Sequence, residues 1–450
     1  MNANRRVLQF VAGSFSLYLL VSFAALFLPI SWTPLNRVNL ISDLFPGNVL
    51  TSLPSDRSDK TDSPVVVIEK RPDRKFDLYK QGRSITRFHA DTSAVSLEGF
   101  ARKLAELKAG KRRKVRIAYF GDSMIEGDLL TQTLRQLLQQ QFGGSGVGFV
   151  PITSQVSQFR QTVSHSYSGG WRDENFKSGR SGRLYLSGHV FRSNGDWVQM
   201  TDRTVTDSLA VIEKSLLCGP VSGATAITVN GRSVPLDAGA VVNRIPLAND
   251  RSRSIRVGVS DDRLPVYGIS FESASGIILD NFSFRGITGI EFATIDSAFL
   301  ARIAAANPYD LIVFQYGVNL LFRPNERNFN WYGRTLIPVV RKLQHCFPES
   351  DLLLVSTADR AFRYGGEYRS AVGIDSLVRT QAAIAYETGS SFYNQYASMG
   401  GPNSIVEWAQ QKPSLANRDY VHPNHRGAEV LAGWLYEAIL KDYNKSLRTR

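Results

Sequence analysis

The sequence predicts an α/β fold: a three-layer α/β/α domain on a parallel sheet, with an inserted β-sandwich and an N-terminal transmembrane helix. Strand and helix patterns alternate in residues 91–152 and 277–450, as in a parallel sheet covered by helices. Residues 153–276 hold only short alternating runs, which is typical of antiparallel strands. The first 31 of the 450 residues include an uncharged stretch long enough to cross a bilayer.

Residues 1–31 are predicted to be a membrane anchor. Residues 7–30 carry no charge, and Arg5 and Arg6 precede them. Two arginines before the span and a long domain after it predict an amino terminus in the cytoplasm and the rest of the chain outside. A cleavable signal sequence is the alternative, because residues 22–24 resemble a cleavage site. An uncleaved anchor is favoured, since cleavage there would leave an apolar start to the mature chain.

Residues 32–90 are rich in Ser, Asp, Pro and Arg and are predicted to be a flexible linker. A helical pattern at residues 96–109 then leads into the basic run 111–114, and the whole chain has a net charge of +13. Such charge fits attraction to anionic lipid or polymer, or a simple solvated surface. No nucleic-acid partner is expected, because the basic run has no interleaved aromatic residues and the anchored chain lies outside the cell.

A buried strand is predicted at residues 115–120, and it ends at Gly121-Asp122-Ser123 before a leucine-rich helical pattern. A serine between a buried strand and a helix lies where open α/β sheets place reactive groups. Backbone N–H groups of the following turn can stabilise negative charge there. The plainer alternative is an ordinary turn.

The strands and helices expected after the inserted segment alternate to the end of the chain: strand 277–282, helix 293–306, strand 311–314, helix 331–344, strand 351–356, helix 374–388, strand 391–396 and helix 428–441.

Two more polar motifs lie in this second series. Asn319 ends a Gly-x-Asn motif just after a strand, and Asp419 and His422 form an Asp-x-x-His motif before the final helix. An imidazole can take the proton of Ser123 and return it in one cycle, so His422 is the expected base. Asp419 is expected to fix the tautomer of that imidazole and to stabilise its charged form.

The Gly-Asp-Ser, Gly-x-Asn and Asp-x-x-His motifs, in this order, resemble the SGNH (GDSL-like) hydrolase superfamily. Residues 121–135 (GDSMIEGDLLTQTLR) and 144–152 (GSGVGFVPI) are most similar to the bacterial cell-wall glycan (peptidoglycan) O-acetylesterases. The resemblance implies a flavodoxin-like SGNH sheet and a serine esterase without a cofactor or metal. Met124 replaces a usual leucine and Leu320 an acidic residue, and neither change removes a group that the mechanism needs.

The same resemblance implies an oxyanion hole at three strand ends. The backbone N–H of Ser123, the backbone N–H of Gly289 and the side-chain amide of Asn319 are the expected donors. Glycine lets the backbone approach closely, and asparagine supplies a neutral donor. Family spacing favours Gly289, with Gly286 as the alternative.

The resemblance to the O-acetylesterases implies that residues 153–276 are a carbohydrate-binding-module-like sandwich. Because its ends attach beside the Ser123 helix and the Gly289 strand, we expect it to overhang Ser123 from one side. Trp171 and Trp197, with Tyr167, are candidates for stacking on sugar rings, and a place in the core is the plainer alternative. The strand-like runs are 184–186, 190–192, 197–200, 226–229, 254–259 and 266–271, and Asn194-Gly195 and Asn230-Gly231 are expected hairpin turns.

The motifs have two alternative interpretations. An α/β-hydrolase would have a second glycine where Ile125 stands, so that fold is disfavoured. Asp419, His422 and His425 have spacing that can bind zinc, but this reading would leave the other two motifs without a role. A structural or surface role is expected for the remaining histidines, His89, His165, His189 and His345. Cys218 and Cys346 are expected to be buried free thiols rather than a bridged pair.

These expectations combine into one leading function, a serine esterase that removes O-acetyl groups from a cell-wall or extracellular polysaccharide. The anchor would hold it at the inner membrane, with the catalytic domain facing the periplasm or exterior. One alternative is an O-acetyltransferase that works beside a multipass membrane acyl donor, because an acyl-serine can also be captured by a sugar hydroxyl. The other is a glycan-binding protein with an inert hydrolase domain.

Overall fold

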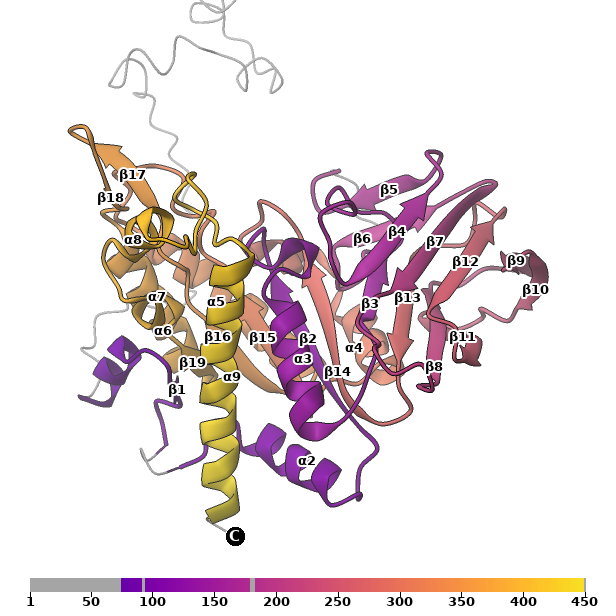
Figure 1. Cartoon of the computed structure of the whole chain (residues 1–450), viewed down its shortest axis with the longest axis horizontal. Helices are drawn as coiled ribbons and strands as arrows, with labels where there is room; N and C mark the ends of the chain where they lie inside the picture. The colour runs from indigo at the N-terminus through magenta and orange to yellow at the C-terminus, as the bar shows by residue number, and fades with distance from the viewer. Residues whose placement is uncertain (1–73, 91–93, 179–182, 449–450) are drawn as a thin grey trace, which may run out of the picture. The chain divides into compact units, whose positions relative to one another are not determined.

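A computed structural model describes residues 74–90, 94–178 and 183–448 of the chain. Its central sheet has the strand order β1-β19-β16-β15-β2-β14, and the five strands from β19 to β14 are parallel (Figure 1). Numbered along the chain, these five have the order 2-1-3-4-5 that is typical of flavodoxin-like sheets. Their bounds are β2 Lys114–Gly121, β14 Gly276–Ser283, β15 Leu311–Gln315, β16 Asp351–Val355 and β19 Ser391–Tyr393.

Helices cover both faces of this sheet, which gives the three layers predicted. On β2, Ile117 and Tyr119 pack into one apolar cluster, whereas Ala118 and Phe120 pack into the other. Because both faces are covered, the strand is an almost continuous apolar run. The first cluster includes residues of α2 (Glu98–Lys108), α3 (Thr131–Phe142) and α9 (His425–Arg448), and the second includes residues of α4 (Ser297–Ala306), α5 (Asn330–Cys346) and α6 (Ile374–Thr388).

Some element ends differ from the sequence-based prediction because side chains cap the helices. The region expected to be one helix, 293–306, is instead a 3₁₀ turn, η4 (Ile290–Thr294), followed by α4. Asp296 caps the start of α4, because its side chain accepts the N–H of Phe299 at 2.9 Å. Likewise β19 ends early, since Asn394 caps the short helix α7 (Gln395–Met399). The last helix is longer at both ends than predicted.

The prediction of a flexible linker over residues 32–90 is wrong for residues 74–90. Residues 74–90 contain η2 (Arg74–Lys80) and β1 (Ile85–Thr86), which pairs with β19 in antiparallel fashion. Phe76 and Phe88 are buried in the main core, so this segment belongs to the folded domain. The predicted anchor and the rest of the linker lie outside the described residues. Within the described part of the chain, no helix is long and apolar enough to span a membrane.

The inserted segment forms two antiparallel sheets that share an apolar core and lie beside the edge strand β14 (Figure 1). One sheet has the order β10-β9-β12-β7-β4 and the other β11-β8-β13-β6-β5, with β3 also paired to β13. The strands are β3 Gly148–Pro151, β4 Val163–Tyr167, β5 Arg172–Asn175, β6 His189–Arg192, β7 Asp196–Asp202, β8 Ile212–Cys218, β9 Thr225–Val229, β10 Arg232–Leu236, β11 Asn243–Asp250, β12 Ser254–Val259 and β13 Val266–Glu272.

Three local expectations for the sandwich fail. Strand β3 pairs with β13, so the sandwich sheet begins before residue 153. The Asn194-Gly195 turn joins β6 to β7, which belong to different sheets, whereas Asn230-Gly231 does close the β9–β10 hairpin. Residues 184–186 are buried but form no strand. As expected, Cys218 and Cys346 are both free and buried.

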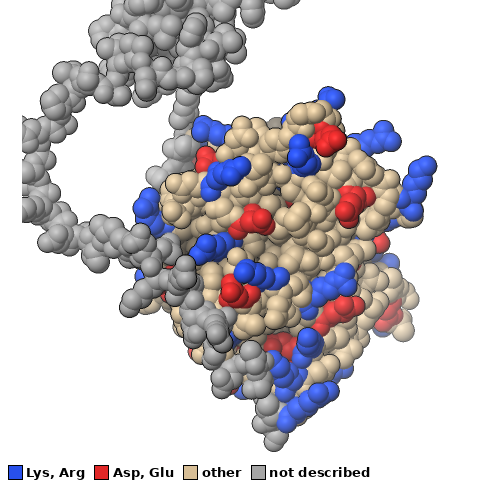
Figure 2. Space-filling view, turned by 90° about the vertical axis from the view of Figure 1, so that its left-hand side faces the viewer, with Lys and Arg blue, Asp and Glu red and all other residues tan. Residues whose placement is uncertain are grey.

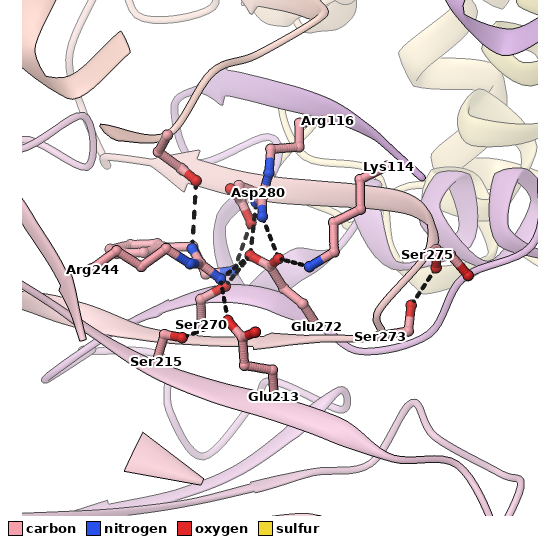
Figure 3. A network of polar contacts seen from close by, with 12 residues as sticks. Lys114, Arg116, Glu213, Ser215, Arg244, Ser270, Glu272, Ser273, Ser275 and Asp280 are labelled. Carbon is pink, nitrogen blue, oxygen red and sulfur yellow. Dashed lines mark hydrogen bonds and ion pairs between the residues drawn. The ribbon is translucent and has the colours of Figure 1, made fainter. Parts of the chain in front are cut away.

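A buried charge network fastens the sandwich to the parallel sheet (Figure 3). Glu272, at the end of β13, is fully buried and meets Lys114 at 2.9 Å, Arg116 at 2.7 Å and Arg244 at 2.6 Å. Burial alone would raise the pKa of Glu272, but the arginines outweigh burial and hold that pKa well below its usual range. Because breaking such a pair leaves charge stranded in the interior, the network holds the two units in one orientation.

Two of the four basic residues in the run at 111–114 form such pairs. Arg112 pairs with the buried Asp310, and Lys114 pairs with Glu272. On the face shown in Figure 2, lysine and arginine are interspersed with aspartate and glutamate. On that face, the mixture of both signs of charge favours a solvated surface over a binding site for anionic lipid or polymer as the explanation of the net charge of +13.

Candidate active site

Ser123, His422 and Asp419 form a hydrogen-bonded chain at the carboxyl end of β2. The Ser123 Oγ lies 2.9 Å from His422 Nε2, and His422 Nδ1 lies 2.8 Å from Asp419 Oδ2. The serine follows β2, whereas the other two residues precede α9. The fold therefore brings together the three residues that the sequence singled out, at the switch point between β2 and β15 where open sheets bind ligands.

The Asp419 carboxylate is held in its ionised form. Its Oδ1 accepts the backbone N–H groups of Val421 at 3.0 Å and His422 at 3.1 Å. Burial would raise the pKa of Asp419, but the hydrogen bonds from the His422 side chain and these backbone groups lower it to about 2. A carboxylate on Nδ1 favours the tautomer with its proton there, which leaves the Nε2 lone pair facing the serine.

Polar side chains fix the loop that carries Ser123. Asn281, on β14, donates to the Ile125 carbonyl at 2.8 Å and to Thr131 Oγ1 at 2.7 Å. Asp128 is buried in a left-handed conformation with φ of 69°, and its carboxylate pairs with Arg135 at 2.7 Å. These contacts come from both sides of the loop, so they define its path between β2 and α3.

The Asn319 amide joins three strand ends. Its Nδ2 donates to Asp122 Oδ2 at 3.0 Å and to the Ile287 carbonyl at 2.9 Å. Both amide hydrogens therefore have acceptors, and the expected role of Asn319 as an oxyanion donor requires that one of these acceptors be replaced. The backbone N–H groups of Ser123 and Gly289, in contrast, donate to no acceptor within residues 74–90, 94–178 and 183–448.

Gly289 and Gly286 lie in different surroundings. Both have left-handed backbones, with φ of 90° and 78°. A Cβ at Gly289 would lie 2.7 Å from the Phe314 ring and 2.8 Å from the Tyr316 ring, whereas at Gly286 it would meet the Lys177 ammonium at 2.9 Å. Phe314 lies in β15 and Tyr316 in the turn between β15 and Asn319, so Gly289 packs against the segment that carries Asn319. The position of Gly289 therefore fits the expected oxyanion donor better than that of Gly286.

Two groups beside the serine were not singled out in the sequence. Asp122 is fully buried, and burial raises its pKa to about 7 despite the N–H that Met124 donates at 3.0 Å. The hairpin of β17 (Ala361–Tyr364) and β18 (Glu367–Ser370) contacts the Asp-x-x-His loop through a hydrogen bond from the Ala361 N–H to the Tyr420 carbonyl at 2.9 Å. The sequence contains a signal for this hairpin, because Gly365-Gly366 lies between two short runs of alternating apolar and polar residues.

The structure does not bring Trp197 to Ser123. Trp197 lies on the outer face of the β7 sheet, under the Arg256 guanidinium at 3.8 Å, whereas the other sandwich sheet faces the parallel sheet. Trp171 is half-buried against the sandwich core and donates to the Trp197 carbonyl at 3.1 Å. Tyr167 also packs on that core, so the plainer alternative holds for it and Trp171.

A cavity of about 300 Å³ separates the Ser123 loop from the sandwich. Glu126 and Arg285, which form an ion pair, line the side that belongs to the parallel-sheet domain. Asp173 and His189, paired at 2.8 Å, line its sandwich side. The cavity lies beside Glu126–Asp128, on the loop after Ser123, and its lining does not include Ser123, Asn319 or His422, so the overhang of the serine itself stays a prediction.

No cluster of three His, Cys, Asp or Glu side chains arranged to hold a metal occurs within the described residues. His425, part of the zinc reading, is the first residue of α9. The other histidines whose contacts are described have structural partners. His165 Nε2 bonds the Ile152 carbonyl at 2.9 Å, with its pKa lowered by burial to about 4, and His89 bonds the Tyr386 carbonyl at 2.7 Å.

No family model matches the sequence, and no curated protein matches it significantly. The solved structure of a peptidoglycan O-acetylesterase matches 80% of this chain and 99% of its own, with a TM-score of 0.67 and 21% identity. This likeness confirms the expected fold, a parallel sheet covered by helices with an inserted β-sandwich. The solved structure of a family two carbohydrate esterase from Cellvibrio japonicus matches 63% of this chain and 99% of its own, with a TM-score of 0.27 and 10% identity.

Proposed function

We propose that this protein is a serine esterase that removes O-acetyl groups from a cell-wall or extracellular polysaccharide. The observation that carries the proposal is the chain from Ser123 Oγ through His422 to Asp419, with contacts of 2.9 and 2.8 Å. A serine, a base and an orienting carboxylate in hydrogen-bond contact are what nucleophilic acyl transfer needs.

In the proposed reaction, Ser123 Oγ attacks the acetyl carbonyl while His422 Nε2 takes the serine proton. The tetrahedral intermediate collapses as His422 returns that proton to the sugar oxygen, which leaves as an alcohol. The acetyl group is then on Ser123. Water, with its proton taken by His422, attacks this ester, and acetate leaves as the serine regains its proton.

The oxyanion formed in each half-reaction needs donors that do not have to reorganise. The N–H groups of Ser123 and Gly289 meet this need, since neither is used within the described part of the protein. Asn319 is the third donor, and it exchanges one of its present acceptors for the oxyanion. One such donor is commonly worth about 3 kcal/mol in the transition state.

Two observations support a polysaccharide substrate. The chain shares its fold over 80% of its length with a peptidoglycan O-acetylesterase. The fixed sandwich and the cavity of about 300 Å³ beside the Ser123 loop also provide contacts remote from the reacting carbon. Such contacts orient a polymer whose acetyl group alone reaches the serine.

Location is a separate proposal that rests on the sequence alone. Residues 1–31 would anchor the enzyme in the inner membrane with its catalytic domain facing the periplasm or exterior. The full-length chain should then resist alkaline extraction, and a carboxyl-terminal tag should be accessible from outside the cytoplasmic membrane. A soluble protein beginning near Ala25 would show instead that the segment is a cleaved signal.

The test is acetate release from a panel of O-acetylated glycans and from 4-nitrophenyl acetate, with transfer to unacetylated glycan assayed alongside. Wild type should release acetate, and Ser123→Ala and His422→Ala should each lose nearly all activity while keeping their folded circular dichroism spectra. The double variant should lose little more, because triad residues act as a unit. Transfer without hydrolysis would favour an O-acetyltransferase with a membrane acyl-donor partner. Glycan binding without either reaction would show an inert hydrolase domain.

A further inference from the structure

Arg360 places a guanidinium between the Asn319 strand end and the Asp-x-x-His loop. It lies in the segment that follows β16, the neighbour of β15 in the sheet. Its Nη1 donates to the Val318 carbonyl at 3.0 Å, and its guanidinium lies 4.8 Å from the centre of the Phe362 ring. The next residue along, Ala361, donates its N–H to the Tyr420 carbonyl. The guanidinium is therefore held at the edge of the proposed active site.

This guanidinium has no anion of its own. Within the described residues, no carboxylate lies within 4.0 Å of it, and its Nε is buried without a hydrogen-bond acceptor. The carboxylate that acts on its charge is Asp419, which is already bonded to His422. Three more deeply buried arginines differ, because each has a carboxylate partner: Arg116 pairs with Glu272, and Arg135 and Arg160 pair with Asp128.

A half-buried cation without a partner gains free energy when a ligand supplies an anion. Burial lowers the pKa of Arg360 more than the nearby Asp419 carboxylate raises it, so Asp419 only partly offsets the hydration that the charged form loses. A carboxylate fits better than a more highly charged group, since the Asp419 carboxylate lies nearby. Guanidinium also matches the geometry of a carboxylate with two parallel hydrogen bonds.

We propose that Arg360 is a specificity-determining residue that binds a carboxylate of the glycan close to the acetylated sugar. The inference rests on the proposed esterase function and narrows its substrate to an acidic glycan. The carboxylate can belong to the sugar ring, as in a hexuronic acid, or to an ether-linked side chain, as in muramic acid. Both present the same anion to Arg360.

The experiment compares matched acid and amide substrates with the folded chain. O-acetylated hexuronic acid and O-acetylated muramic acid are each assayed beside their primary amides, and 4-nitrophenyl acetate serves as the neutral reference. The wild type should prefer one or both acids over their amides by roughly 10- to 100-fold in kcat/KM. Arg360→Gln should abolish that preference, mainly through a higher KM for the acid, and leave turnover of 4-nitrophenyl acetate unchanged.

Arg323→Gln is the matched control, because Arg323 also lies over an aromatic ring, that of Phe322, on the loop after Asn319. It should keep the preference for acids, and Arg360→Lys should keep only part of it, since an ammonium lacks the planar fork. Equal rates of the wild type on both acid–amide pairs would overturn the inference. So would an equal loss on 4-nitrophenyl acetate in Arg360→Gln, which would mean that Arg360 only positions Val318 and Asn319. A wild type inactive on every ester would refute the esterase function itself.

Discussion

The ring of Tyr368 stacks on that of Tyr420, with centroids 4.1 Å apart and an interplanar angle of 27°. Tyr420 lies between Asp419 and His422 in the sequence and has a left-handed backbone, with φ of 55°. Such a conformation is unfavourable for a residue with a Cβ and persists only where its surroundings enforce it. The hairpin that carries Tyr368 thus supports the Asp-x-x-His loop, although it supplies none of Ser123, His422 and Asp419.

Tyr368→Ala should therefore lower kcat on 4-nitrophenyl acetate by roughly 3- to 10-fold, because an aromatic pair contributes about 0.5–1.5 kcal/mol. The KM should change little, since Tyr368 has no proposed role in binding so small an ester. Tyr368→Phe keeps the stack and should behave as the wild type does. Unchanged kcat in Tyr368→Ala, measured beside an unchanged melting temperature, would show that the stack does not hold the loop.

Gly289→Ala and Gly286→Ala should separate the two candidate oxyanion glycines. A methyl group at Gly289 would meet two buried aromatic rings at 2.7 and 2.8 Å, whereas at Gly286 it would meet the movable end of Lys177. We expect Gly289→Ala to lose about 100-fold in kcat, comparable to one oxyanion donor, and Gly286→Ala to lose much less. Steady-state kinetics on 4-nitrophenyl acetate measures both, and the reverse order would assign the role to Gly286.

The Asp122 carboxyl should make stability depend on pH. Burial raises its pKa from the ordinary 3.8 to about 7, so between these values the folded protein keeps a proton that the unfolded chain releases. Its contribution to stability is then fully present below about pH 4 and lost as the pH rises through about 7. Asp122→Asn cannot titrate and should gain a few kcal/mol relative to wild type between pH 5 and pH 8. Urea unfolding at the two pH values measures this gain, and parallel changes in both proteins would contradict it.

Glu272→Gln should destabilise the protein by about 3 kcal/mol, because it leaves Lys114, Arg116 and Arg244 without their shared carboxylate. Glu106→Gln is the control, since it breaks only the exposed pair with Arg102 on α2 and should cost about 0.3–0.5 kcal/mol. Urea unfolding followed by circular dichroism compares them. Equal small losses would mean that the network does not fasten the sandwich.

The sequence predicted those features whose physical cause is local or periodic. Strands buried on both faces read as continuous apolar runs, as at β2, and the motif order placed Ser123, Asn319 and His422 at the carboxyl ends of strands or next to the final helix. Burial and pairing across the fold were not predictable in this way. From the sequence, Trp197 is a candidate for stacking on a sugar ring. In the structure it lies on the outer face of the β7 sheet, away from the serine.

Other differences arise because local signals do not specify partners. The Asn194-Gly195 dipeptide signals a turn, but which sheet each flanking strand joins depends on contacts distant in sequence. The polar composition of residues 32–90 hides Phe76 and Phe88, whose burial against the core is a tertiary effect. Likewise, nothing local marks Arg360 as a cation without a carboxylate partner.

The central claim, that Ser123 carries the acetyl group during turnover, is tested most directly by rapid-quench mass spectrometry. The protein is mixed with 4-nitrophenyl acetate, quenched in acid after a few milliseconds to seconds, digested and sequenced by fragmentation. We expect one acetyl group on the peptide that contains Ser123, which forms before steady-state acetate release and is absent from Ser123→Ala. Turnover without acetylation of Ser123, or acetyl transfer that persists in Ser123→Ala, would contradict it.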